Sequence, residues 1–150
     1  MLRIIQKLNT MLIKFLSRFE WLPLLLLRLS LGYVFLLSGQ GKLLNLERTA
    51  SYFTSLHIPF ALFNAILASS TEFLGGILLI LGLFTRVTSV ALAFVMVIAI
   101  VTAQLPNNIG NIGEFTGLIE WAYFLIFISF VFSGAGVISL DKILKIDNKN

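Results

Sequence analysis

The chain has 150 residues, of which 58% are hydrophobic and only 12% charged, with a net charge of +4 and a mean hydropathy of +0.97. Soluble domains are about 45–50% apolar and about 25% charged, so this composition excludes an ordinary soluble domain and predicts that lipid surrounds most of the chain. The absence of cysteine excludes disulfides and thiolate sites, and the single histidine, His57, excludes a haem held between two histidines of one copy.

Residues 1–20 have the pattern of an amphipathic helix that lies on the membrane surface. At about 100° per residue, basic side chains gather on one side of this helix and apolar side chains on the other. Such a helix places its basic side on lipid headgroups, so we expect contact with anionic lipids rather than with nucleic acid. The alternative is a basic flank that only orients the first span. The basic side is formed by Arg3, Lys7, Lys14 and Arg18.

Four apolar segments follow, each near the length of about 20 residues that crosses a bilayer. Pro23 fits the first turn of the first span, where no backbone donor is needed, and Gly39 and Gly41 are expected to loosen the helix after that span. A short amphipathic helix is expected over 46–56, and Pro106 is expected to break the third span. The predicted spans cover residues 21–37, 60–84, 87–105 and 118–137.

The sequence therefore predicts an all-α membrane protein. A four-helix transmembrane domain over 21–137 follows the surface helix over 1–20, and a basic tail over 138–150 is expected to fray. Eight Lys and Arg residues lie on the side of the two termini and the second-to-third turn, against two on the other side. The positive-inside rule then places both termini in the cytoplasm.

Two ionisable residues lie inside the predicted spans. Arg28 is about 10 Å and Glu72 about 18 Å from the cytoplasmic surface, at about 1.5 Å per residue. A charge at the bilayer centre costs about 2.5–3.5 kcal/mol on insertion scales, and pairing offsets part of that cost. Two interpretations stay open: an Arg28–Glu72 pair that fixes helix register, or a proton or ligand site in which Glu72 titrates.

Small residues lie beside Glu72 at helical spacing. Small side chains let helix backbones approach closely in lipid, so this pattern indicates helix packing, with a backbone-lined ligand notch as the alternative. The residues are Thr71, Gly75 and Gly76.

A second polar cluster is expected on the outer side of the bundle. It is interpreted either as a shallow mouth or as an ordinary headgroup rim, and Glu120 stands apart because it lies just inside an apolar run. No spacing typical of a metal site occurs, and His57 in the outer connection is most simply a solvated side chain. The cluster comprises Gln40, Lys42, Gln104, Glu114 and Glu120.

Several motifs, in their order along the chain, resemble the DoxX family. They are the stretch from Arg28 to Phe35, then Ser38-Gly39-Gln40-Gly41-Lys42, Ile58-Pro59, Thr71-Glu72-Phe73-Leu74-Gly75-Gly76 and Leu81-Gly82-Leu83-Phe84-Thr85-Arg86, within residues 24–137. The resemblance implies a four-helix protein of the bacterial inner membrane. Its relatives are linked to terminal quinol oxidases, thiosulfate:quinone oxidoreduction and oxidative-stress complexes. Ser38 stands where some relatives have histidine. The family-like positions are Arg28, Lys42, Glu72, Gly75, Gly76 and Arg86.

The first functional hypothesis is a redox-linked membrane subunit that helps to bind quinone while a soluble or membrane partner carries electrons. The chain itself supplies no cofactor, and whether it is an enzyme stays open. A quinone site needs an apolar slot with a few polar groups. The candidate proton-handling residues are Glu72 and Glu120, and the candidate ligand-binding residues are Arg28, Lys42, Glu72, Gln40 and Gln104.

Two other hypotheses remain. A non-catalytic anchor or assembly factor would use the basic N-terminal helix and the basic tail as its docking face. A small transporter would need homo-oligomerisation, since four spans are few and no inverted repeat is visible.

Overall fold

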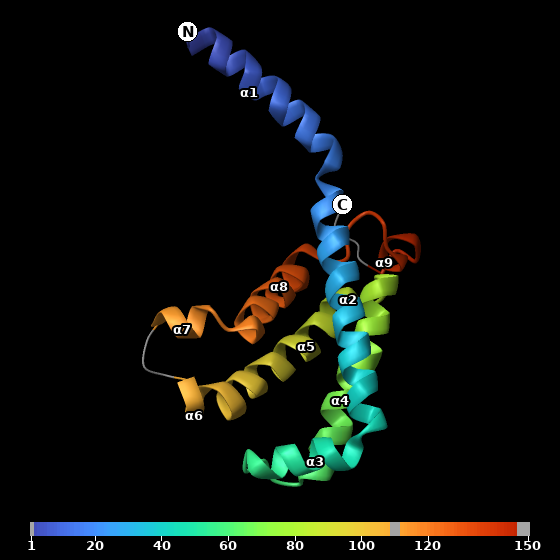
Figure 1. Ribbon diagram of the computed structural model, residues 1–150. Coiled ribbons are helices and arrows are strands. Elements are labelled where there is room, and N and C mark those ends of the chain that lie inside the picture. Colours follow the sequence, from blue (N-terminus) through green and yellow to red (C-terminus); the bar gives the residue numbers. More distant parts are fainter. Residues whose placement is uncertain (1, 109–111, 147–150) are drawn as a thin grey trace.

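The computed structural model describes residues 2–108 and 112–146, and its regular elements in these ranges are all helical (Figure 1). The elements are α1 (Leu2–Leu16), the 3₁₀ turn η1 (Ser17–Phe19), α2 (Trp21–Leu44), α3 (Leu46–Ser55), α4 (Ala61–Leu81), α5 (Thr85–Ala99), the π-helical turn η2 (Ile100–Gln104), α6 (Leu105–Asn108), α7 (Ile112–Thr116), α8 (Ile119–Ser133) and α9 (Leu140–Ile143). The prediction of an all-helical fold is confirmed for this part of the chain.

Three helices in the described residues are long and apolar enough to cross a membrane: Trp21–Leu44, Ala61–Leu81 and Thr85–Gln104. The fourth predicted span corresponds to α8, an apolar helix of 15 residues. At about 1.5 Å per residue it is about 22 Å long, which is less than the bilayer core of about 30 Å. The predicted connecting helix over 46–56 is present as α3.

The longest helix, α2, corrects the predicted end of the first span. It continues to Leu44 instead of ending near residue 37. Gly39 does not loosen this helix but lets it cross α4 closely, because a Cβ at Gly39 would lie 2.3 Å from the backbone nitrogen of Phe73. Gly32 and Gly76 meet in the same way about two helical turns away, and a Cβ at Gly76 would lie 2.4 Å from the backbone nitrogen of Leu36.

Pro106 also behaves differently from the prediction, because the helical path continues through α6 to Asn108. The turn before it, η2, is π-helical, with Leu105 donating to the carbonyl of Ile100. Proline lacks an N–H and its ring crowds the carbonyl four residues earlier, so a wider turn at this point accommodates it without ending the helix.

The core lies where α2, α4, α5 and α8 meet. Phe35 packs edge-on against Phe127, with ring centroids 5.1 Å apart, and against Tyr123 at 5.6 Å. Edge-to-face geometry of this kind is the preferred arrangement of aromatic pairs. The buried core residues are Leu31, Phe35, Leu79, Leu92, Ala93, Met96, Phe127 and Phe130.

The start of the predicted tail packs against the bundle at Ser139 and Asp141, so the expectation of fraying is wrong there, whereas residues 142–146 are exposed. Asp141 is buried, and its carboxylate accepts hydrogen bonds from the backbone nitrogens of Phe84 and Thr85 at 2.7 and 2.9 Å. These are free donors at the start of α5, where a carboxylate is favourable. Residues 147–150 of the predicted tail lie outside the described residues.

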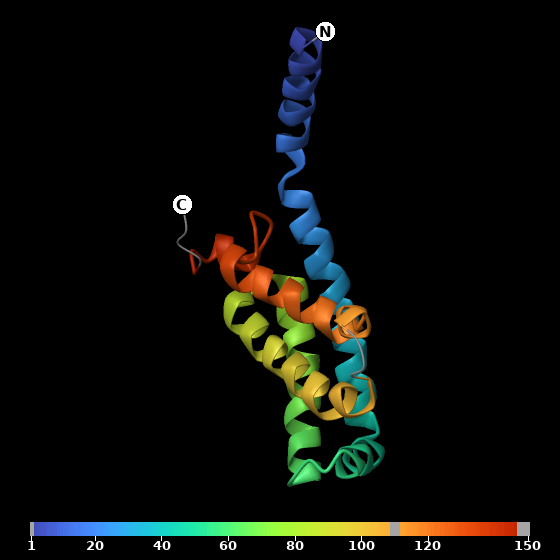
Figure 2. The ribbon, with the colours of Figure 1, turned by 90° about the vertical axis from the view of Figure 1, so that its left-hand side faces the viewer.

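The N-terminal helix α1 extends away from the bundle in both views (Figures 1 and 2). Its apolar side chains are exposed, among them Leu8, Met11 and Phe15. Arg3, Lys14 and Arg18 are exposed as well, whereas the side chain of Lys7 lies outside those described.

Substitution of Gly39 tests the close contact between α2 and α4. Gly39→Ala would force the two backbones apart, and overpacking of this kind costs about 1–3 kcal/mol, so the melting temperature in detergent should fall. Gly41→Ala is the matched control, because nothing lies within 4 Å of a Cβ at Gly41. Alanine favours a helix by about 1 kcal/mol over glycine, so the control should be neutral or stabilising. Equal melting temperatures for the two variants would contradict the contact.

Candidate functional site

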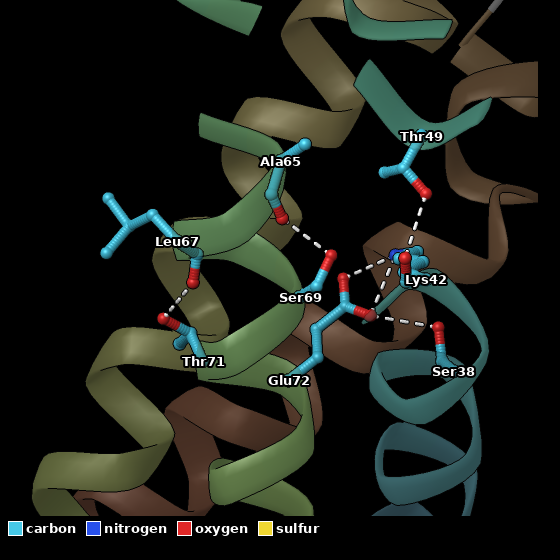
Figure 3. A network of polar contacts seen from close by, with 8 residues as sticks. All are labelled: Ser38, Lys42, Thr49, Ala65, Leu67, Ser69, Thr71 and Glu72. Atoms are coloured by element: carbon cyan, nitrogen blue, oxygen red, sulfur yellow. Dashed lines mark hydrogen bonds and ion pairs between the residues drawn. The ribbon is translucent and has the colours of Figure 1, made fainter. Parts of the chain in front are cut away.

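The centre of the candidate site is an ion pair between α4 and α2 (Figure 3). Both carboxylate oxygens of Glu72 accept hydrogen bonds from Nζ of Lys42, at 2.6 and 2.7 Å. Ser38 donates a third hydrogen bond to Oε2 at 2.9 Å. Glu72 is only 2% exposed, whereas the Lys42 side chain is 38% exposed, so Lys42 is the more accessible member of the pair.

Two local features of the sequence bring these groups together. Because α2 continues to Leu44, Ser38 and Lys42 lie one helical turn apart on the same face. The antiparallel crossing at Gly39 then sets that face against Glu72 in α4. Thr49 of α3 donates to the carbonyl of Lys42 at 3.3 Å and so links α3 to the same turn.

The interpretation of an Arg28–Glu72 pair is wrong. Arg28 instead donates to the carbonyls of Ala135 and Ile138, at 2.5 and 2.7 Å, and lies beside Gly82 at the other end of α4. The register of the crossing explains this, because Ser38 lies opposite Glu72, and the ten residues from Arg28 to Ser38 span about 15 Å of helix. An arginine side chain cannot bridge that separation in addition to the gap between the helices.

A cavity of about 890 Å³ adjoins the ion pair. Its walls come from α2, α3, α4, α5 and η2, and most of its lining is apolar. A smaller cavity of about 190 Å³ lies toward α8, and Ser38, Lys42, Glu72, Ala99 and Glu120 line both cavities. Cavities with apolar walls and a few convergent polar groups are typical of sites for small organic ligands.

A second carboxylate faces the same space from α8. Glu120 accepts a hydrogen bond from Nε2 of Gln104 at 2.9 Å, and both residues line the larger cavity. Gln104 belongs to η2, so the π-helical turn is the element that brings its amide to Glu120. Turns of this type frequently occur at functional sites.

The structure thus brings together four of the sequence-predicted site residues and leaves others apart. Lys42, Glu72, Gln104 and Glu120 line one space, so the outer cluster and the intramembrane glutamate form a single site. Gln40, Glu114 and His57 are exposed and do not line either cavity, and Arg28 belongs to the opposite end of the bundle.

The predicted packing residues divide between two roles. Gly76 contacts α2, and Gly75 contacts Leu92 of α5. Thr71 instead lines the larger cavity, with its hydroxyl bonded to the carbonyl of Leu67 at 2.8 Å. Arg86 donates to the carbonyl of Val131 at 2.7 Å, near the end of α8.

Two residues of the site, Ser38 and Thr49, were not predicted from the sequence. Ser38 was noted only as a replacement for histidine, and Thr49 was not singled out. The position of Ser38 four residues before Lys42 is the signal that would have identified it, once α2 is taken to continue past Gly39. Among the described residues, no group of three His, Cys, Asp or Glu side chains could hold a metal ion.

The asymmetric burial of the pair predicts an asymmetric response to mutation. Lys42→Met leaves a buried carboxylate with Ser38 as its one remaining side-chain donor and should cost about 3–5 kcal/mol of unfolding free energy. Adding Glu72→Gln removes the unpaired charge and should restore most of that loss. The measurement is denaturant unfolding of all three variants in detergent. Additive losses in the double variant would show that the two side chains do not interact.

Comparison with known proteins gives a consistent assignment. The DoxX family model matches residues 23–105. A Bacillus subtilis (strain 168) protein named "Putative oxidoreductase CatD" is 31% identical over 84% of this chain and 90% of its own length. "Inner membrane protein YphA" of Escherichia coli (strain K12) is 29% identical over 79% of this chain and 88% of its own length.

An uncharacterised membrane protein of Mycobacterium tuberculosis is 35% identical to the chain, over 77% of both proteins. No solved structure matches the chain. The names of these relatives agree with the three long apolar helices in identifying a membrane protein. Because the family model covers more than half of the sequence, and a relative above 30% identity is covered almost completely, the chain belongs to the DoxX family.

Proposed function

We propose that the protein is the membrane subunit of a respiratory or oxidative-stress redox system and that it binds a quinone beside Lys42. The supporting observation is the ion pair itself, which lies at the inner wall of a mostly apolar cavity large enough for a quinone head. The name of the Bacillus subtilis relative, an oxidoreductase, agrees with a redox role.

Lys42 is the donor that would hold the quinone. A lysine ammonium has three N–H donors, and Glu72 is its hydrogen-bond partner within the described residues. The Lys42 side chain lines the cavity and is 38% exposed, so its ammonium can donate to a carbonyl oxygen of a quinone head bound there. Glu72 then acts as a positioning residue, because its buried carboxylate fixes the direction of Lys42.

Glu120 is the better placed proton-handling group. Its side chain is half-buried and lines the cavity, with the neutral amide of Gln104 as its hydrogen-bond partner. Reduction of a quinone to a quinol takes two electrons and two protons, and a carboxylate at the cavity wall can transfer protons to or from the head oxygens. The electrons come from a partner protein, since the chain has no cysteine and one histidine with which to hold a redox centre.

Quinone content tests the proposal. The protein is purified gently from its membranes and extracted with solvent, in wild type, in Lys42→Met/Glu72→Gln and in Gln40→Ala. We expect bound quinone in the wild type and in the Gln40→Ala control, whose side chain is exposed and lines neither cavity. The double variant should stay folded and lose the quinone. A stable wild type without quinone would contradict the proposal.

That contrary result would favour the second candidate, a membrane anchor. The observation behind it is α1, which extends from the bundle with exposed apolar and basic side chains. A helix of this kind can lie on anionic lipid or receive a partner protein.

We also propose that α8 crosses the membrane as a fourth span and that both termini are cytoplasmic. In support, α8 follows α5 along its length: Glu120 contacts Gln104 at one end, and Arg86 contacts Val131 at the other. Ile138 and Asp141, which follow α8, contact Arg28 and the α4–α5 turn, so the described residues after α8 lie on the side where α2 begins.

Reporter fusions at each terminus test this topology. A reporter that is active only in the periplasm should be silent at both the N-terminus and the C-terminus. The control is the same reporter inserted after Leu56, in the connection between α3 and α4, where we expect activity. Activity at the C-terminus alone would mean that α8 does not cross.

A further inference from the structure

The larger cavity reaches the outside of the bundle between α4 and α5, where several of its lining side chains are exposed. On α4 the lining includes Leu67 and Ala68, and on α5 it includes Ala91, Phe94 and Ile98. Three of these side chains are also exposed on the outside of the protein: Phe94 by 65%, Leu67 by 54% and Ile98 by 40%. The cavity wall and the outer surface therefore share residues along the gap between α4 and α5.

The path of the chain explains this opening. The turn at residues 82–84 joins α4 to α5, and α5 then diverges from α4 toward η2 and α6 (Figure 1). Gly75 packs against Leu92 near the joined end, which closes the gap there. Farther along, Ala68 and Ala99 line the cavity with small side chains that leave the gap unfilled.

The end of the cavity toward the α2–α3 connection is covered by α3. Thr49, Tyr52 and Phe53 of α3 line the cavity from that end, and Thr49 is tied to the last turn of α2. The charged groups Lys42 and Glu72 lie on the inner wall, away from the α4–α5 gap. The polar head of a ligand would thus lie deep in the cavity, and its apolar part would extend outward along α4 and α5.

We infer that the cavity opens sideways into the bilayer between α4 and α5, and that its ligand is a lipid-soluble molecule whose long apolar chain leaves through this opening. The lining carries Lys42, Arg48, Glu72 and Glu120, two charges of each sign, which matches an uncharged head rather than an anionic one. The identity of the ligand rests on the quinone proposed above, whereas the sideways opening rests on the geometry alone.

The absence of cysteine allows the opening to be tested with single labelled positions. Ala68→Cys in the full-length protein is labelled with a fluorophore and placed in bilayers whose acyl chains carry bromine, which quenches on contact. Leu74→Cys, on the exposed surface of α4, is the control for lipid, and Ser55→Cys, exposed at the end of α3, is the control for water. We expect residue 68 to be quenched by brominated chains as Leu74→Cys is, and not by aqueous iodide.

Quenching of residue 68 by iodide but not by lipid would overturn the inference, because the cavity would then open to water. Absence of quenching by either agent would overturn it as well, because the cavity would be closed.

Two quinones that share a head group but differ in their chain then test the identity of the ligand independently of the sideways opening. A quinone with a long isoprenoid chain should displace lipid and lower the quenching at residue 68, whereas the same head without a chain should not. Equal protection by both quinones would contradict an apolar chain in the opening. If brominated lipid quenches the label at residue 68 and neither quinone reduces this quenching, the quinone assignment is contradicted, whereas the sideways opening is supported.

Discussion

A carboxylate in the apolar interior of a membrane protein needs a partner, and the arrangement of this bundle follows from how Glu72 finds one. Desolvation of an unpaired charge costs several kcal/mol, so Glu72 requires a cation and further donors at short range. Lys42 and Ser38 supply them from one face of α2. Replacing a buried ion pair by apolar residues is often neutral or even stabilising, so stability alone does not account for this pair. Its position at the wall of a large cavity is the reason for the ligand-binding role proposed above.

The ion pair depends in turn on how closely α2 and α4 approach, and the two ends of the bundle differ as a result. At the end near Arg28, backbone carbonyls and donors are held by charged side chains: Arg28 binds the segment after α8, Arg86 binds the end of α8, and Asp141 caps α5. This end is tightly connected. At the other end α5 diverges from α4, and the space left between them is the cavity. The two ends thus divide the bundle into a tightly connected part and a part that contains the proposed ligand site.

The sequence allowed the helical membrane fold and the connecting helix α3 to be predicted, because hydropathy is a local signal. Charge near or inside apolar runs also pointed to Lys42, Glu72 and Glu120, which the structure places around one cavity. The predicted partner of Glu72, Arg28, is wrong because the pairing depends on how the helices cross. Gly39 and Gly41 are typical of a helix end, so the sequence predicted Lys42 to lie in a loop. In the structure Gly39 instead lies where α2 crosses α4, and the helix continues past Lys42. Which residues of two antiparallel helices lie opposite each other depends on where the helices cross, and not only on how deep each residue lies in the membrane. The capping role of Asp141 likewise needs a long-range contact that no local pattern reveals.

The distance between the Lys42 ammonium and the Glu72 carboxylate is the most direct test of the ion pair. Solid-state NMR on the protein in bilayers, with ¹⁵N in lysine and arginine side chains and ¹³C in glutamate carboxylates, measures this as a dipolar coupling. We expect a strong lysine–glutamate coupling that disappears in Lys42→Met, since Lys42–Glu72 is the one salt bridge found within residues 2–108 and 112–146. A coupling that survives Lys42→Met, or a strong arginine–glutamate coupling that disappears in Arg28→Met, would contradict this ion pair.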